Sequence, residues 1–498
     1  MSNSDIQDTS GTKPKLSFWQ IWNVSFGFLG VQFGFALQNA NASRILSDLG
    51  ADLHSLSLFW LVAPIMGLLI QPLVGSASDR TWNRVGRRNP YILVGGLLAA
   101  IGMLLMPNSS SLAAFITPLF FGAMMLAFMD ASFNMAFQPF RALVSDMVPA
   151  EQHNVGYSIQ SFLINIGAVC GSILPFVLTN VIGLENTAST GEVAPSVIWA
   201  FYIGASVMLG SVLWTVLRTK EYAPGENGQP LIDKTAVDLP IFTKLKDFFA
   251  LVKTMPKTMQ QLAVVQFFSW FALFIMWVYT NPALAQHIWG VDAKWFDPTY
   301  LATVENIPEH IVNAKSTAAD WVGIVFAAYS LFAAIFSIFL SKIANKFGRK
   351  LTYSLSLLAG GLGYLSIFML QNPELTMVNL GITEIEVPQG AVSLFLPMIG
   401  IGIAWAAILA MPYAILAGSL PVKQTGVYMG IFNFTIAAPQ IVSGIFAGWI
   451  LTSVFENQAI YIIMLAGLSM ILGAASVYFI KDSTCDAVTN KGNAVAQS

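Results

Sequence analysis

Charged residues are scarce in this chain of 498 residues. They make up 10% of the composition, while hydrophobic residues make up 55%. A soluble domain carries roughly 25% charged residues, so the deficit excludes an ordinary water-soluble protein and indicates lipid as the solvent. The net charge of −2 gives no basis for binding nucleic acid.

Cysteines and catalytic motifs are also lacking. The two cysteines are Cys170, in an apolar run, and Cys485, in the polar C-terminal stretch. They form neither a metal-ligand spacing nor a plausible disulfide pair. No zinc-protease motif, phosphate-binding loop or nucleophile elbow is present. We therefore expect no enzyme activity, no cofactor and no metal, and an ion gradient or the substrate's own gradient as the energy source.

Long apolar runs are what the sequence has in abundance. A membrane-spanning helix needs about 20 apolar residues, and twelve segments approach or exceed that length. The first six are Phe18–Asn39, Ser55–Ser78, Tyr91–Pro107, Leu112–Gln138, Tyr157–Ile182 and Val197–Leu217. The second six are Leu262–Ile288, Trp321–Ile343, Thr352–Leu370, Ala391–Gly418, Gly426–Thr452 and Ala459–Ile480. The sequence thus predicts an all-α integral membrane protein with twelve transmembrane helices.

One clear linker divides these segments into two sets of six. It contains the Pro- and Gly-rich run EYAPGENGQP. We predict an N-terminal six-helix bundle at residues 1–217 and a cytoplasmic linker at 218–260. A C-terminal six-helix bundle at 261–480 and a cytoplasmic tail at 481–498 complete the predicted organisation.

The distribution of lysine and arginine tests the count of spans. With a cytoplasmic N-terminus, all but three of the 24 basic residues fall on the cytoplasmic side, the exceptions being Arg44, Lys294 and Lys315. This bias follows the positive-inside rule. One missed or invented span would invert every later loop and destroy the pattern, so we expect both termini in the cytoplasm.

The two sets of spans also resemble each other. The loop after the second span reads DRTWNRVGRRNP, and the loop after the eighth reads KIANKFGRK. Each carries glycine, arginine and a further basic residue at the same place. Two six-span repeats related by an axis along the membrane normal are typical of secondary transporters, whose substrate site lies between the halves near the midplane. The sequence therefore predicts two pseudo-symmetric bundles.

An acidic residue inside a span is the sharpest functional signal. When the 26 Asp and Glu residues are sorted against the predicted spans, Asp130 alone falls within one. Intramembrane carboxylates are costly and are functional by default. A buried carboxyl group can bind and release one proton, and when ionised it can accept hydrogen bonds from sugar hydroxyls. Asp130 is thus the candidate for coupling a proton to a substrate.

Uncharged amides accompany Asp130 and suit a substrate with many hydroxyl groups, because each amide offers both donors and acceptors. Asn134 lies one turn after Asp130 on the same helix face. The other candidates are Gln32, Gln38, Asn39, Gln160, Asn165, Asn281, Asn433 and Gln440. For each amide alone, an interhelical hydrogen bond is an equal alternative.

Aromatic residues inside the spans complete the predicted site. Sugar rings present C–H faces that pack on aromatic rings, so a sugar site mixes amides with a few rings. The candidates are Trp270, Trp277 and Trp405. Arg141, near the cytoplasmic end of the fourth span, is either a further site residue or an interfacial anchor.

Several motifs resemble those of one known family. They are GVQFGFALQ at Gly30–Gln38, QPLVGSASDRTWNRVGRRNPYI at Gln71–Ile92, Asp130 with Asn134, the run from Pro139 through Arg141 to Asp146, Asn165, Pro412–Ala414, and GVYMGIFNFTIAAPQIV at Gly426–Val442. Together they resemble the plant sucrose–proton symporters and the SLC45-type sugar transporters. These belong to the glycoside–pentoside–hexuronide group of major facilitators, and the likeness covers nearly the whole chain.

The resemblance implies the major facilitator fold and proton symport of a disaccharide or glycoside, such as sucrose or maltose. It carries proton coupling onto Asp130 and an essential charge onto Arg141. It also implies a conformational gate that contains Asp79, Arg80, Gly86, Arg87 and Arg88. Sodium-coupled melibiose-type relatives carry acids in the second span as well, and none lies in Ser55–Ser78, which favours protons over sodium.

Alternatives to sugar import stay open at this point. The nearest rival is a transporter that exports sugar or carries another polar solute, and a transporter-like membrane sensor is a rival of a different class. By analogy with major facilitators we expect a monomer. The short termini favour the plasma membrane of a bacterium. The expected partners are a small-molecule sugar, a proton and the lipid bilayer.

Overall fold

The computed structural model of the chain describes residues 13–113, 115–189, 191–227, 255–379, 384–417 and 425–480. Most of the predicted linker and all of the predicted tail lie outside these residues, so the predicted bundle boundaries stay predictions. In the N-terminal half the long helices are α1 (Phe18–Ser25), α2 (Gly27–Asp48), α3 (Leu53–Trp60), α4 (Val62–Arg80), α5 (Asn89–Leu105), α7 (Pro118–Met147), α8 (His153–Asn180) and α9 (Pro195–Arg218). The short α6 (Ser109–Leu112) lies between α5 and α7.

The C-terminal half repeats this helical organisation. Its long helices are α11 (Lys257–His287), α13 (Glu309–Phe347), α14 (Arg349–Ile367), α16 (Phe395–Ala417), α17 (Thr425–Ser453) and α18 (Ala459–Ser476). Short helices α12 (Pro298–Leu301) and α15 (Gln389–Ser393) lie in the connections. Strands β1 (Leu375–Asn379) and β2 (Glu384–Pro388) form an antiparallel hairpin between α14 and α15. The hairpin was not predicted, and it is the one departure from an all-α chain among the described residues.

Eleven helical segments in the described part of the chain are long and apolar enough to cross a membrane. They correspond to the second through twelfth predicted spans. The first predicted span is the pair α1 and α2, which is less apolar because α2 carries several amides and Arg44. The structure therefore supports a multi-pass membrane protein built from two sets of helices.

A side chain from α9 explains why the first span is divided into two helices. The Thr215 hydroxyl donates to the Asn23 carbonyl at 2.9 Å and accepts from the Gly27 amide at 2.8 Å. It therefore stands in place of the helical hydrogen bond from residue 27 to residue 23. A side chain inserted into the backbone ladder is a common cause of a helix break. Gly27 also admits the Phe140 ring, which lies 2.1 Å from where a Cβ would be.

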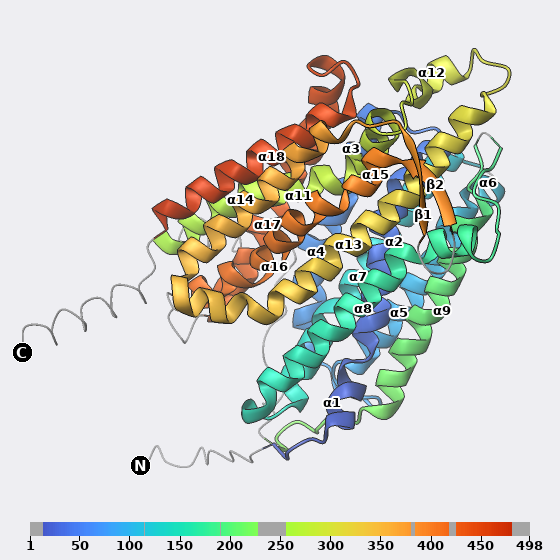
Figure 1. The fold of residues 1–498 in the computed structure, drawn as a ribbon. Helices are drawn as coiled ribbons and strands as arrows, with labels where there is room; N and C mark the ends of the chain where they lie inside the picture. Colours follow the sequence, from blue (N-terminus) through green and yellow to red (C-terminus); the bar gives the residue numbers. More distant parts are fainter. Residues whose placement is uncertain are drawn as a thin grey trace, which may run out of the picture.

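Each half packs as its own bundle, and the halves then meet along a defined set of helices. In the N-terminal half α2 packs against α8 and α9, and α5 and α4 pack against α7. In the C-terminal half α11 packs against α17 and α18, and α14 packs against α16 and α18. Contacts between the halves join α8 to α13 and α3 to α17. Figure 1 shows the halves closest at the end that carries α12, α15 and the hairpin.

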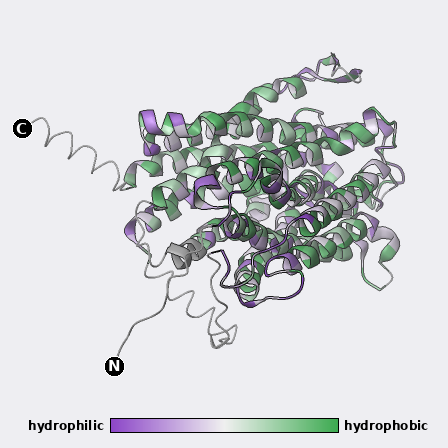
Figure 2. Cartoon of the chain, turned by 90° about the horizontal axis from the view of Figure 1, so that it is seen from below, coloured by the Kyte–Doolittle hydropathy of each residue, from purple (hydrophilic) through white to green (hydrophobic). Residues whose placement is uncertain are grey.

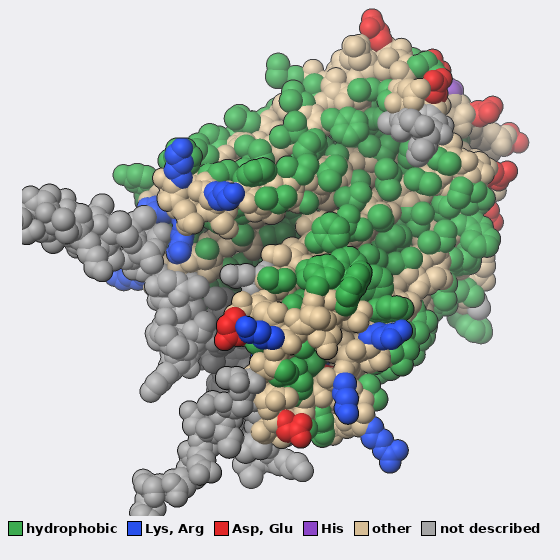
Figure 3. Space-filling view, turned by 60° about the horizontal axis from the view of Figure 1, so that its bottom comes forward, with side chains coloured by type: hydrophobic (Ala, Val, Ile, Leu, Met, Phe, Trp, Pro, Cys, Tyr) green, Lys and Arg blue, Asp and Glu red, His purple; other side chains and the backbone are tan. Residues whose placement is uncertain are grey.

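The surface matches a protein in lipid. Large apolar side chains such as Leu217, Ile338 and Leu396 are more than two-thirds exposed, and Figure 2 shows hydrophobic residues along most of the helices. Figure 3 shows Lys and Arg side chains near the end of the molecule where α1 begins and α18 finishes, with a hydrophobic belt beside them. This separation is the arrangement that the positive-inside rule describes.

The structure corrects the prediction that Asp130 is the only acid inside a span. Helix α13 begins at Glu309, a dozen residues before the predicted start of the eighth span, so Asp320 lies within it and is buried. Its partner is Arg44, which was assigned to an outer loop and instead lies buried in α2. Both residues were missed because hydropathy marks the apolar core of a span and not the full length of its helix.

Candidate functional site

The candidate proton site is the buried carboxyl group of Asp130 in α7. Gln38 of α2 donates its side-chain amide to Asp130 Oδ1 at 3.0 Å. Asp130 Oδ2 and Gln38 Oε1 are also buried, and neither has a hydrogen-bond partner among the described residues. A buried carboxylate without a basic partner is costly. The arrangement therefore favours a protonated carboxyl group in this conformation and leaves one oxygen free for a ligand.

A chain of amides extends from Asp130 between α4 and α7. Asn134 donates to the Asp130 carbonyl at 2.8 Å and accepts a hydrogen bond from Gln71. Gln138 in turn donates to Gln71 Oε1 at 2.8 Å. Gln71 and Gln138 were not among the predicted site residues. Gln71 lies inside the second predicted span, Ser55–Ser78, where a polar residue between apolar ones was already a signal.

Helix α2 presents one half-exposed stripe in an otherwise buried stretch. Between residues 31 and 40, Gln32, Phe35 and Asn39 alone are half-buried and their neighbours are fully buried. Their spacing of three and four residues places them on one helix face. On this face Phe35 packs against Phe133 and Phe137 of α7, with ring centroids 4.5 and 6.1 Å apart, so the stripe adjoins the helix that carries Asp130. Two of the predicted amides, Gln32 and Asn39, thus keep part of their surface uncovered by other described residues.

The predicted tryptophans come together in the C-terminal half. The ring centroids of Trp270 and Trp277 in α11 lie 5.9 and 6.0 Å from that of Trp405 in α16. Tyr329 of α13 adds a fourth ring, 6.4 Å from Trp405. The Trp270 indole nitrogen is buried and has no hydrogen-bond partner among the described residues. This group, the tryptophan cluster, supplies both apolar ring faces and a free donor.

The remaining amides are less well placed for a shared site. Asn165 and Gln440 each donate to a carbonyl of their own helix, at 2.8 and 3.2 Å. Gln160 and Asn281 are buried and Asn433 is half-buried. Gln160 Oε1 has no partner in the described part of the chain. No described hydrogen bond joins any of these five to Asp130 or to the tryptophan cluster.

Arg141 lies between the halves near the C-terminal end of α7. Its guanidinium lies 4.4 Å from the Phe137 ring centroid. It is also close enough to interact electrostatically with Tyr157 of α8 and Tyr413 of α16. No ion pair of Arg141 is seen among the described residues, and the side chain is exposed. An exposed charge that faces both halves is available to a ligand, or to a side chain of the other half when the halves move. This position favours a site residue over an interfacial anchor.

The predicted gate residues form one polar cluster at the base of the N-terminal half. Asp79 accepts from Arg87 at 3.0 Å and from Arg88 at 2.6 Å. Arg88 also bonds to Asp146 at 3.0 Å. Arg80 is exposed at the end of α4. The loop between α4 and α5 is therefore tied to both α4 and α7.

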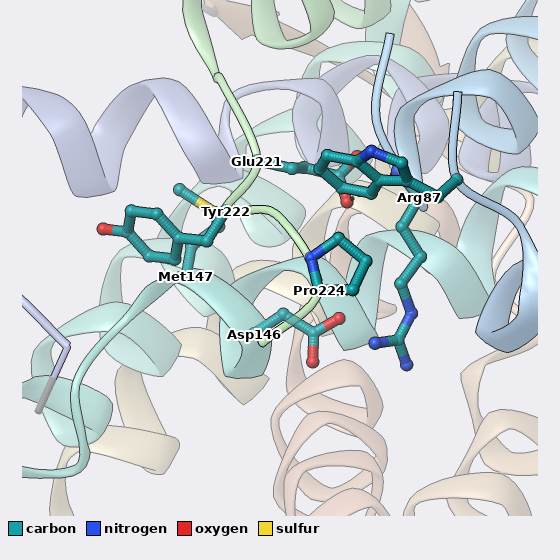
Figure 4. A pocket seen from close by; sticks show the side chains of 7 residues that line it. Arg87, Asp146, Met147, Glu221, Tyr222 and Pro224 are labelled. Atoms are coloured by element: carbon teal, nitrogen blue, oxygen red, sulfur yellow. Dashed lines mark hydrogen bonds between the residues drawn. The ribbon is translucent and has the colours of Figure 1, made fainter. Parts of the chain in front are cut away.

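Glu221, just after α9, completes this cluster and was not predicted. Its carboxylate accepts from the backbone amides of Arg87, Arg88 and Asn89 at 2.8–3.0 Å, at the start of α5. Burial raises the pKa of Glu221 more than these three donors lower it. Gly86 has a φ of +127°, and an added Cβ would lie 2.4 Å from Glu221 Oε1. Figure 4 shows Arg87, Asp146 and Glu221 around the adjoining pocket.

One known protein resembles this chain over most of its length, and another resembles about a third of it. A sucrose transport protein of Arabidopsis thaliana is 22% identical over 459 residues, which cover 88% of this chain and 85% of that protein. A proton-associated sugar transporter of Mus musculus is 29% identical over 178 residues, 34% of this chain and 24% of that protein. These relatives confirm the resemblance that the motifs indicated.

The fold agrees with solved transporter structures. The nucleoside transporter NupG aligns with a TM-score of 0.61 at 17% identity, covering 92% of this chain and 99% of that one. The model of the Major Facilitator Superfamily matches residues 24–304 and 299–496. The prediction of a transporter rather than an enzyme is confirmed by this match and by the relatives. The chain belongs to the Major Facilitator Superfamily.

Proposed function

We propose that this protein is a proton-coupled symporter that imports a disaccharide or glycoside, sucrose- or maltose-like, by alternating access. The observation that carries the proposal is the Asp130 carboxyl group, held by Gln38 on one oxygen and free on the other. The names of the relatives agree, since one is a sucrose transport protein and another a proton-associated sugar transporter.

The proposed cycle begins when Asp130 takes up a proton from the outside. The sugar then binds between the halves, with its hydroxyls on the amides near Asp130 and its C–H faces on the tryptophan cluster. Because one carboxyl oxygen of Asp130 is free, the same residue can hold the proton and contact the sugar. The halves then rock, and both ligands leave on the other side. Coupling follows because sugar stabilises the protonated state.

The polar cluster at the base of the N-terminal half supports the rocking step in this proposal. Asp79, Arg87, Arg88, Asp146 and Glu221 bind the α4–α5 loop to the ends of α7 and α9. The N-terminal half can then move as one body. We further propose that the protein acts as a monomer in the plasma membrane of a bacterium, with both termini in the cytoplasm. The linker at residues 218–260 would join the two moving bundles.

The experiment that tests the proposal is uptake into proteoliposomes that contain the purified protein. Labelled sucrose, maltose and other glucosides are compared with and without an inward proton gradient, and with a sodium gradient as a control. The proposal predicts accumulation of at least one sugar only under the proton gradient. Accumulation under sodium alone, or of none of the sugars, would contradict it. Counterflow with candidate solutes then tests an exporter or another polar substrate.

A further inference from the structure

Three polar residues join the two halves at the end that carries α12, α15 and the hairpin. Arg44 Nη1 in α2 lies 3.2 Å from Asp320 Oδ1 in α13. Arg44 Nη2 donates to the carbonyl and side-chain oxygens of Asn186, at 2.7 and 3.0 Å. Asn186 Nδ2 donates to Asp320 Oδ2 at 2.8 Å. We call these three residues the outer cluster, since they form a closed ring of hydrogen bonds.

The outer cluster spans the boundary between the halves. Arg44 and Asn186 belong to the N-terminal half, and Asp320 belongs to the C-terminal half. The Ser43 hydroxyl, next to Arg44, donates to the Val278 carbonyl of α11 at 2.9 Å. At Gly323, one turn after Asp320, an added Cβ would lie 2.3 Å from the Ser172 carbonyl of α8. The helices of the two halves are therefore in backbone contact beside the cluster.

Asp320 has its charged partner, Arg44, only while the halves are in contact, whereas Arg44 also lies 3.8 Å from Asp48 of its own helix. Arg44 and Asp320 are each 5% exposed. Removing one partner of a buried ion pair is strongly unfavourable because the other charge is left without compensation. A polar cavity of about 510 Å³, lined partly by Asn186, Asp320 and Glu384 of β2, lies against the cluster. If the halves separate here, solvent can enter and hydrate both charges.

We propose that Arg44, Asp320 and Asn186 form the external gate of the transport cycle. The gate holds the outer ends of the halves together in this conformation and must open before a solute enters from outside. Asp320 is then a positioning residue, which sets the balance between the two conformations without touching the sugar. The kinetic part of the test below rests on the proposed function, whereas its labelling part requires only alternating access and the proposed orientation, with both termini in the cytoplasm.

The labelling experiment measures how often the outer ends separate. Cys170 and Cys485 are replaced by serine, and Ser43→Cys, at a residue that is 2% exposed, serves as the reporter. A membrane-impermeant thiol reagent is added outside right-side-out vesicles. Asp320→Asn is expected to speed labelling about tenfold. The closed state loses its ion pair and becomes less stable, so the population of the open state rises. Asp320→Glu, which keeps the charge, is expected to label at close to the parent rate.

A matched control and a double variant separate gating from misfolding. Asp292→Asn breaks an exposed ion pair with Lys294, 3.6 Å apart, and should leave labelling unchanged. The double variant Arg44→Gln with Asp320→Asn removes both charges of the buried pair and leaves Lys315 near Asp48, so it should fold, and it should label as fast as Asp320→Asn. Parent-rate labelling in the double variant would overturn the proposal, as would equal acceleration by Asp292→Asn.

Transport kinetics supply a readout that a purely structural role would not move. An open external gate raises the fraction of molecules that can bind external sugar, so the apparent KM should fall. The maximal rate should fall as well, because closing the outer side becomes slower. Loss of folded protein would lower the maximal rate and leave the KM unchanged, which would count against the gate. If no sugar is transported while the labelling result holds, the proposed substrate fails and the external gate stands.

Discussion

Asp130 differs from every other acid in the described residues by combining burial, an amide partner and a free oxygen. Asp320 is equally buried, but each of its oxygens has a partner. The contrast separates a carboxyl group that is open to a ligand from one that is used in packing. It also gives Asp130 and Asp320 different expected phenotypes.

Asp130→Asn is expected to abolish uphill uptake and to spare exchange. The amide has almost the same shape and still accepts a hydrogen bond from Gln38, but it cannot bind and release a proton. Accumulation under a proton gradient and counterflow at equal pH are measured side by side in proteoliposomes. Proton-driven accumulation that survives in this variant would remove Asp130 from coupling.

Trp405→Ala is expected to weaken sugar affinity. Trp405 contacts both other tryptophans and Tyr329, so truncation removes the centre of the tryptophan cluster. We expect the KM for sugar to rise about tenfold, which corresponds to about 1.4 kcal/mol. Trp405→Phe keeps an aromatic face and serves as the control. An unchanged KM in Trp405→Ala would place the sugar elsewhere.

At the scale of helices, two side chains hold helices of the N-terminal half together through hydrogen bonds to backbone groups. One is the Thr215 hydroxyl between α1 and α2, and the other is Glu221 at the start of α5. Each connects α9 to a distant helix and satisfies backbone groups that would otherwise be unpaired. Buried backbone groups without partners are rare, so both contacts should matter for stability.

Thr215→Val is expected to lower the free energy of unfolding by about 1–3 kcal/mol, because the Asn23 carbonyl and the Gly27 amide lose their partner. Valine keeps the shape of threonine, so the loss reports the hydroxyl alone. Thermal unfolding in detergent measures the effect, with Thr215→Ser as the control that retains the hydroxyl. Equal stability of the valine variant and the wild type would show that water or a direct backbone bond replaces Thr215.

Gly86→Ala is expected to destabilise the α4–α5 loop by about 1–3 kcal/mol, since its φ of +127° is unfavourable for alanine. The added methyl group would also displace Glu221 from the start of α5. Gly75→Ala in α4 is the matched control, because its Cβ meets nothing within 4 Å. Melting temperature and uptake rate are measured together, and a neutral Gly86→Ala would refute the role assigned to this turn.

At the scale of the whole molecule, the opposite ends of the helices have opposite environments. Lys294 lies between α11 and α13, and Arg84 lies between α4 and α5. We expect a cysteine at residue 294 to be labelled by an impermeant reagent added outside intact cells. A cysteine at residue 84 should be labelled only after the membrane is permeabilised. The reverse pattern would invert the proposed topology, and labelling of both from outside would contradict the count of spans.

The contacts of the predicted site residues differ in how far they reach along the sequence. Asp130 and Asn134 share a helix face, so their proximity follows from helical periodicity alone. The hydrogen bond from Gln38 to Asp130 joins residues 92 positions apart, and the Arg44–Asp320 pair joins residues 276 apart. Such pairs require knowledge of how helices pack, which is why Asp320, Glu221 and the role of Gln71 were missed.

The amino-acid sequence by itself determined that lipid surrounds this protein, where its spans lie and that its two halves repeat. These features depend on local hydropathy and on the charges within single loops. It also identified Asp130, since a lone acid in an apolar run needs no partner to be noticed. Only the tertiary structure decided which polar groups satisfy one another: Asp130 with Gln38, Glu221 with the start of α5, and Arg44 with Asp320. Buried polar groups must find partners wherever packing brings them, and packing is a property of the whole chain.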